Sequence, residues 1–232
     1  MDNAPLRLLR LLEAMKAFPH KEQSLASAWK AVLKIEDDMD MPQKVGAVLL
    51  LSGQAARQVL DADPEALGAV QHWRHRLYQF CTYGFGSKWS EAESQIDKHT
   101  LHYLKMHARL LEYVAPTKDV PVDRLIEAAI ALEAAISEIR SSELRSDLKF
   151  LIIDRIQAII AAIDNYSITG QEAVFNAFKI AGIDLREPLG DNDIPAKAQL
   201  REGLSIIADL MTVAASGVAL SGPVKQLLEL VQ

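Results

Sequence analysis

Cysteine is almost missing from this chain, which holds only Cys81 among its 232 residues. One thiol cannot form an internal disulfide, and stable disulfides are common only in oxidising compartments. We therefore expect a cytoplasmic protein whose stability comes from packing. The chain is suited to this, because hydrophobic residues make up 50% of it and a protein of this length buries a sizeable core.

Long hydrophobic runs are missing too. The longest stretch without a charge, residues 210–224, has 15 residues, whereas a helix that crosses a bilayer needs about 20. The first 18 residues place a charge within every short apolar run, which predicts an amphipathic helix rather than a secretory signal. Stable membrane insertion is not expected. One alternative stays open, because the small and apolar residues within 204–231 are also typical of a segment that acts on a membrane once released.

The chain also lacks an excess of basic charge, since its formal net charge is -6. Residues 1–116 carry 14 basic and 14 acidic side chains, and residues 117–232 carry 11 and 17. Proteins that bind duplex nucleic acid concentrate Lys and Arg on one face, so nucleic acid is not an expected partner. All six histidines and all three tryptophans lie in the first half, which together with the uneven charge predicts two modules with different surfaces.

Segments that alternate at period two, as strands do, are missing as well. Apolar residues instead recur at intervals of three and four, which predicts an all-α fold: a multi-helix bundle of about ten helices in two helical modules. The segment APTKDVP coincides with the change in composition, so the predicted modules are 1–115 and 121–232. The expected helices are 5–17, 22–38, 43–61, 64–82, 90–115, 121–141, 143–165, 170–182, 195–215 and 222–231.

The expected helix 143–165 is apolar over a wide face, and Ile126 and Ile130 lie beside the apolar stripe of the helix before it. Such breadth indicates contact with more than one neighbour. Two interpretations remain open: a central helix of an intramolecular bundle, or a helix that also forms the seam of a homodimer. The residues expected to mediate self-association are Leu148, Ile152, Ile156, Ile159 and Ile163, with Leu227, Leu228 and Val231 in second place.

Two His-x-x-His pairs, His72 with His75 and His99 with His102, flank a short break that contains glycine. In an antiparallel hairpin the two pairs lie at one level, and four imidazoles can bind zinc tetrahedrally. This pattern supports an alternative function as a metal-dependent enzyme. A helical wheel favours solvated or hydrogen-bonded histidines, because His72 and His75 lie opposite the apolar face of their helix. No other cofactor is expected.

The break itself, GFGSKWS, holds the ingredients of an anion site: Gly84, Gly86 and Lys88 before a helix N-terminus. The spacing of a P-loop is missing, so a plain turn between two helices is the competing interpretation. Cys81 follows the apolar stripe of its helix and is interpreted as a small buried hydrophobe. His107 also lies within an apolar stripe, which predicts a core histidine with a hydrogen-bond partner.

The segment LKFLIIDRIQAIIAAIDNYSITGQEAVFNAF at 148–178 joins a long apolar helix to a second helix that opens with Tyr166, Ile168, Gly170, Glu172 and Ala173. It resembles a pattern found in uncharacterised all-helical bacterial proteins. The resemblance implies a bacterial cytoplasmic protein, an accessory or regulatory component of a mobile-element or phage-defence system, and it brings no catalytic residue with it.

No complete active-site signature occurs in the chain. We therefore expect a non-enzymatic protein that works by protein–protein contact, as a homodimer or larger oligomer, and with a further protein partner whose identity the residues do not reveal. A metal-dependent enzyme and a membrane-acting effector remain the two alternatives.

Overall fold

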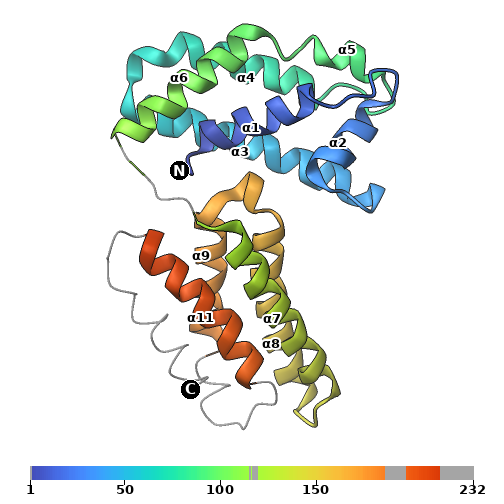
Figure 1. Ribbon diagram of the computed structural model, residues 1–232, viewed down its shortest axis with the longest axis vertical. Helices are drawn as coiled ribbons and strands as arrows, with labels where there is room; N and C mark the ends of the chain where they lie inside the picture. The colour runs from blue at the N-terminus through green and yellow to red at the C-terminus, as the bar shows by residue number, and fades with distance from the viewer. Residues whose placement is uncertain (1, 115, 117–119, 186–196, 215–232) are drawn as a thin grey trace. The chain divides into compact units, whose positions relative to one another are not determined.

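The computed structural model describes residues 2–114, 116, 120–185 and 197–214 (Figure 1). Within these ranges the regular elements are ten α-helices and two 3-10 turns. The prediction of an all-α fold with about ten helices is therefore confirmed. The chain forms two compact units, residues 1–117 and 118–232, and each is described by itself.

The first unit is a bundle of four main helices accompanied by two short ones. Hydrophobic residues at helical spacing line the inner faces of the main helices, which pack along one another. Its elements are α1 (Ala4–Lys16), α2 (Leu25–Leu33), a 3-10 turn (Asp38–Asp40), α3 (Met41–Ala62), a 3-10 turn (Pro64–Ala66), α4 (Leu67–Cys81), α5 (Trp89–Glu93) and α6 (Lys98–Val114).

The start of α6 is set by a capping side chain. Asp97 Oδ1 accepts a hydrogen bond from Thr100 N at 2.6 Å, which satisfies one of the four amides that have no partner within a helix. The expectation of one continuous helix over 90–115 is therefore wrong in this detail. A turn at residues 94–97 separates the short α5 from α6.

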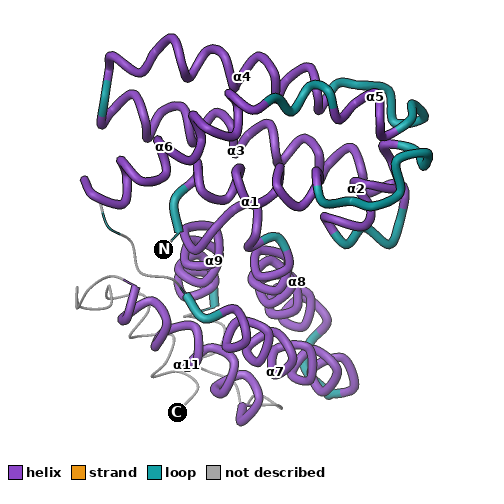
Figure 2. The backbone as a smooth tube through the Cα atoms, turned by 45° about the horizontal axis from the view of Figure 1, so that its top comes forward, coloured by secondary structure: helices purple, strands orange, loops and turns teal. Residues whose placement is uncertain are grey.

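The two halves of the first unit repeat one order of elements: long helix, extended turn, short helix, long helix. Residues 21–26 and 85–90, which cover these turns and the first residues of α2 and α5, pair with each other and are named here the clasp. In the clasp Leu25 N donates to Ser87 O and Trp89 N donates to Gln23 O, both at 2.8 Å. α1 packs against α3 and α6, and α4 packs against the same two helices (Figure 2). The two halves thus follow the same order of elements and are joined at the clasp.

Aromatic side chains fill the core of the first unit beside the clasp. Trp29, Phe80 and Trp89 are all fully buried. The rings of Trp29 and Phe80 have centroids 5.0 Å apart, and those of Phe80 and Trp89 are 5.9 Å apart in an edge-to-face arrangement. Such pairs contribute about 0.5–1.5 kcal/mol beyond the area that they bury. The clasp and the aromatic cluster together join the two halves.

The second unit packs four helices of the described chain around an aliphatic core. α7 lies against α8 and α11, and α8 lies against α9 (Figure 1). The core consists of Leu, Ile, Val, Ala and Met side chains, with Phe178 the fully buried aromatic among the residues described. The four helices are α7 (Val122–Ser141), α8 (Ser146–Asp164), α9 (Tyr166–Asp184) and α11 (Lys197–Ala214).

The contact between α7 and α11 is close because a glycine lies within it. A Cβ added to Gly203 would lie 2.7 Å from Leu132 Cγ and 3.0 Å from Ala128 O. Ala131 and Ala135 of α7 are small and buried as well. The distance between two packed helices depends on the side chains at the contact, so these small residues allow the two backbones to approach.

α9 begins earlier than the sequence indicates, at Tyr166 rather than near Gly170. Gly170 interrupts the helix with a φ of 73° and a ψ of -177°. This φ lies in the left-handed region, which glycine adopts at little cost because it has no Cβ. Gly170 is buried, so the kink lies inside the unit and redirects the first turn of α9 over the core.

Candidate functional site

α7 carries apolar side chains on two of its faces. One face, which includes Leu125, Leu132 and Ile139, is buried in the core of the second unit. A further stripe at i, i+4 and i+8 remains outside: Val122 is 51% exposed, Ile126 49% and Ile130 63%. Single exposed hydrophobic residues are ordinary on protein surfaces. Three in register along one helix are typical of a surface that contacts another partner.

α8 carries apolar side chains on two faces in the same way. Its core face is formed by Ile152, Ile156, Ile159 and Ile163. Phe150 lies outside this face and is 74% exposed. The residues at 150, 153, 157, 160 and 164 follow one another at intervals of three and four, so they share one face of α8, which lies beside its core face. On that face Ile153 and Ile160 are half-buried.

The residues expected to mediate self-association thus have a role within the unit. Ile152, Ile156 and Ile159 are fully buried, Ile163 is nearly so, and Leu148 is half-buried against the same core. This corresponds to the first of the two interpretations of the wide apolar face, a central helix of a bundle. A further role of these residues in a homodimer stays a prediction. Leu227, Leu228 and Val231 lie outside the described residues.

A shallow groove of about 370 Å³ runs between α7 and α8. Glu133, Ser137 and Arg140 line it from α7, and Gln157, Ile160 and Asp164 are among the residues that line it from α8. The groove and the exposed apolar stripes belong to one surface, which we name the outer face. It consists of Val122, Ile126, Ile130, Glu133, Ser137 and Arg140 of α7, with Phe150, Ile153, Gln157, Ile160 and Asp164 of α8.

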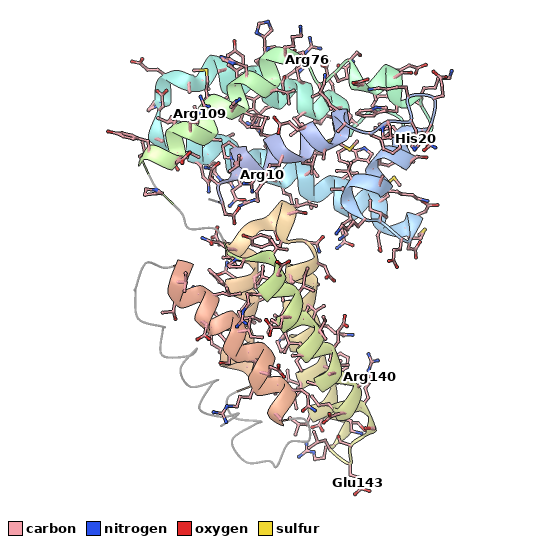
Figure 3. The ribbon with its side chains drawn as sticks, viewed as in Figure 1. Arg10, His20, Arg76, Arg109, Arg140 and Glu143 are labelled. Atoms are coloured by element: carbon pink, nitrogen blue, oxygen red, sulfur yellow. The ribbon has the colours of Figure 1, made fainter. Side chains whose placement is uncertain are left out.

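The charged side chains of the outer face have no oppositely charged neighbour. Within the described ranges, Glu133, Arg140 and Asp164 form no ion pair, although all three line the same groove. Arg140 is exposed and projects from α7 into solvent (Figure 3). On another part of α7, Arg124 and Glu127 pair at 2.9 Å. The outer face therefore combines apolar side chains with charges of both signs that are free to pair with a partner.

The histidines of the first unit form a second polar surface, built around Asp97. His72 Nε2 lies 3.1 Å from Asp97 Oδ2, and Arg76 Nε lies 3.1 Å from the same oxygen. Burial by itself would raise the pKa of Asp97, but hydrogen bonds from Thr100 and His72 outweigh it and lower the pKa to about 2. Asp97 therefore carries its charge at neutral pH and joins α4 to the start of α6.

The structure brings one histidine of each predicted pair together. The rings of His72 and His99 have centroids 6.2 Å apart, and both contact Tyr103. His102 contacts Tyr103 as well, while His75 is exposed. No group of three or more His, Cys, Asp and Glu side chains in the described part of the chain is arranged to hold a metal ion. Helix spacing alone placed all four at one level, whereas the rotation of each helix separates them.

In the predicted anion loop, the lysine and the backbone amides that would bind an anion already have partners within the chain. Lys88 Nζ pairs with Glu22 at 2.7 Å, which raises the pKa of the lysine. The backbone amides of Trp89 and Ser90, at the start of α5, donate to carbonyl oxygens in the other half of the clasp. Gly84 and Gly86 belong to the turn that carries these bonds. The loop connects α4 to α5 and contributes to the clasp, and its binding of an anion stays a prediction.

Two buried titratable groups of the first unit lie away from these surfaces. Burial raises the pKa of the Cys81 thiol to about 12, so Cys81 is not a reactive thiolate at neutral pH. His107 is buried, and burial lowers its pKa, with the charge of Asp63 acting in the opposite direction. His107 was predicted to have a hydrogen-bond partner. One of its ring nitrogens, Nδ1, is buried and has no such partner.

The described helices include none with both the length and the apolar character that a membrane span requires. Part of the segment considered for a membrane role, residues 215–231, lies outside the described ranges. The sequence placed Ile126 and Ile130 beside the core stripe, but it did not single out Glu133, Arg140 or Asp164.

Comparison with protein-family models finds no match, and comparisons with curated proteins and with solved structures find none that is significant.

Proposed function

We propose that the protein acts through protein–protein contact at the outer face, with a second copy of itself as the first partner. The observation that carries this proposal is the stripe of Val122, Ile126 and Ile130, which is half-exposed or more on a helix whose opposite face is in the core. A helix inside a bundle needs one apolar face. A second apolar face is useful when another molecule covers it.

The magnitude of the hydrophobic contribution supports the proposal. Complete burial of a Val, Ile or Phe side chain contributes roughly 1.5–3 kcal/mol relative to full exposure. Ile126, Ile130 and Phe150 have between half and three quarters of their surface in solvent, so each still has about half of that contribution or more to gain. Association also costs translational and side-chain entropy, and several such side chains acting together are needed to offset this cost.

The composition of the outer face fits an interface as well. Protein interfaces combine an apolar centre with a polar rim and are rich in Arg and aromatic residues. The outer face has this mixture, with isoleucines and Phe150 next to Arg140, Gln157 and Asp164. The resemblance of residues 148–178 to all-helical bacterial proteins adds a setting to the proposal, an accessory component of a mobile-element or phage-defence system.

Sedimentation velocity of the full chain over a dilution series tests this function. We expect the wild type to form a dimer or larger assembly and the double variant Ile126→Arg, Ile130→Arg to sediment as a monomer, because two charges then replace the apolar stripe. Ile183→Arg is the matched control. Ile183 is an isoleucine of the same unit with 61% exposure, but it lies on α9, so its variant should still assemble.

Circular dichroism of the three proteins separates lost assembly from lost folding. All the substituted side chains are about half exposed or more, so helical content should agree within experimental error. The thermal midpoint of the assembled proteins should exceed that of the monomeric variant, because association stabilises the folded state. A wild type that remains monomeric at every concentration, or an Ile126→Arg, Ile130→Arg variant that assembles like the wild type, would contradict the proposal.

A further inference from the structure

The charges of the outer face are ordered along α7. Glu133 and Arg140 lie on either side of Ser137, four residues before it and three residues after it, and all three line the groove. With a helix rise of about 1.5 Å per residue, Glu133 is about 6 Å and Arg140 about 4.5 Å from the level of Ser137. A negative and a positive charge are thus placed almost symmetrically about a small residue.

α8 repeats the sign of the charge at the Glu133 end. α7 and α8 are consecutive helices joined by residues 142–145 and packed side by side, so their numbers run in opposite directions along the groove. Near the start of α8, Lys149 Nζ donates to Arg140 O at 3.2 Å. Gln157 therefore lies near the level of Glu133, and Asp164 lies further along, at the end of the groove away from Arg140. One end of the groove is acidic and the other is basic, with Ser137 between them.

Such an order is what a two-fold symmetric interface requires. In an isologous dimer residue i contacts residue j of the partner, and j contacts i, so the surface must be complementary to itself. When the α7 helices of two copies run antiparallel and cross at Ser137, the basic end of each helix reaches the acidic end of the other. A surface with one sign of charge would repel its own copy.

From this order we infer that two copies pack outer face to outer face, with their α7 helices antiparallel about a two-fold axis near Ser137, and that Arg140 pairs with Glu133 of the partner subunit. This inference rests on the proposed function and specifies the geometry of that contact. Two equivalent charge pairs form, one at each end of the groove.

The apolar residues fit the same crossing. Ile130 lies seven residues before Ser137, about 10 Å along α7. Moving the same distance beyond Ser137 passes the end of α7 at Ser141 and reaches the connection to α8, close to Phe150 near the start of α8. The two-fold operation therefore places the exposed apolar end of one α7 near the exposed apolar end of the partner's α8.

Charge reversal tests the arrangement. Arg140→Glu places acidic groups on both sides of the contact, and Glu133→Arg places basic groups there, so each single variant should dimerise at least tenfold more weakly than the wild type. The double variant Arg140→Glu, Glu133→Arg should regain most of the affinity. An equimolar mixture of the two single variants should form a heterodimer, because both pairs are again of opposite sign. Sedimentation equilibrium and native mass spectrometry measure these outcomes.

Arg109→Glu, an exposed charge reversal on α6 of the first unit, is the control for a nonspecific effect of net charge and should leave dimerisation unchanged. The inference is overturned if the single reversals dimerise normally, or if they are weakened and neither the double variant nor the mixture recovers. In both cases the loss of assembly in Ile126→Arg, Ile130→Arg would leave the proposed function standing. A wild type that never assembles would instead remove the proposed function itself.

Discussion

The two units achieve stability in different ways. The first unit joins distant segments through polar contacts, with the backbone clasp between residues 21–26 and 85–90 and the bridge of Asp97 to His72 and Arg76. The second unit has an aliphatic core and leaves the charges of its outer face without ion pairs in the described residues. Polar groups that pair inside a chain specify its own fold. Polar groups that remain unpaired beside exposed apolar side chains are available to a partner.

The unfolding of the first unit can be followed by itself because all three tryptophans lie in that unit. Tryptophan fluorescence therefore follows the unfolding of the first unit, while far-ultraviolet circular dichroism follows the helices of both. Substitutions in one unit that leave the signal of the other unchanged would show that the two modes of stabilisation are independent. Substitutions that shift both signals together would show that the units unfold as one.

The largest expected effect is the loss of an aliphatic core side chain in the second unit. Ile156 is fully buried among residues of α7, α8 and α9. Ile156→Ala should lower the free energy of unfolding by about 2–5 kcal/mol, because it removes buried methylene groups and leaves a cavity. Urea titration followed by circular dichroism measures the change. Ile183→Ala, at an exposed position, should change it by less than about 0.5 kcal/mol, and equal losses in the two variants would contradict the assigned core.

The contact between α7 and α11 predicts the next effect. Gly203→Ala places a methyl group 2.7 Å from Leu132 Cγ and 3.0 Å from the carbonyl oxygen of Ala128, and overpacking of this kind costs about 1–3 kcal/mol. Thermal and urea unfolding should both show the loss. Gly46→Ala is the matched control in α3, since nothing lies within 4 Å of its added Cβ, and it should stabilise the helix by about 0.5–1 kcal/mol. A Gly203→Ala variant as stable as the Gly46→Ala variant would disprove the close approach.

A smaller effect is expected from the polar bridge of the first unit. Asp97→Ala removes the cap of α6 and the contacts to His72 and Arg76, which should cost about 1–2 kcal/mol by tryptophan fluorescence. Asp97→Asn should recover part of the loss, because an asparagine oxygen can still accept from Thr100 N. Equal stability of the Ala and Asn variants would show that capping contributes nothing.

The pH dependence of the same bridge has a definite sign. The folded pKa of Asp97, about 2, is lower than the usual value of about 3.9 in an unfolded chain. Its stabilising contribution is therefore complete above the unfolded value and is lost as the pH falls through the folded one. The difference in unfolding free energy between the wild type and Asp97→Ala should shrink between about pH 4 and pH 2; a constant difference over this range would contradict the low pKa.

Much of the fold is predictable because helices depend on local sequence. Apolar residues at intervals of three and four are sufficient to predict helices over the α7 and α8 segments. The clasp is not predictable in this way. Its two segments, residues 21–26 and 85–90, are far apart in the sequence and pair through backbone amide and carbonyl groups, which carry no sequence signal. Segments KEQSLAS and FGSKWSE have no identical residue at equivalent positions, so the shared order of elements leaves no sequence repeat in the clasp.

The candidate sites show where local patterns stop being informative. Helix numbering placed His72 opposite His102 and His75 opposite His99, whereas the structure brings the rings of His72 and His99 together. Whether His75 and His102 join them depends on how each helix is rotated, which residue spacing does not determine. In the same way Ile126 was visible beside the core stripe of α7, but its exposure depends on where α8 and α11 lie. The unpaired state of Arg140 depends on three-dimensional distances alone.

The smallest effect concerns His107, a buried polar group of the first unit whose Nδ1 has no hydrogen-bond partner. Burial lowers the folded pKa of His107 below the usual value of about 6.5, so the unfolded chain binds a proton more readily than the folded one. The contribution of this group is therefore favourable above about pH 6.5 and decreases as the pH falls from there through the folded pKa. His107→Phe should make the decline in unfolding free energy between about pH 7 and pH 5 less steep. Urea unfolding followed by tryptophan fluorescence measures this decline. The control His75→Phe, at an exposed position, should decline with pH as the wild type does. If His107→Phe kept the wild-type slope, another group would be responsible, and the missing partner at Nδ1 would have no consequence for stability.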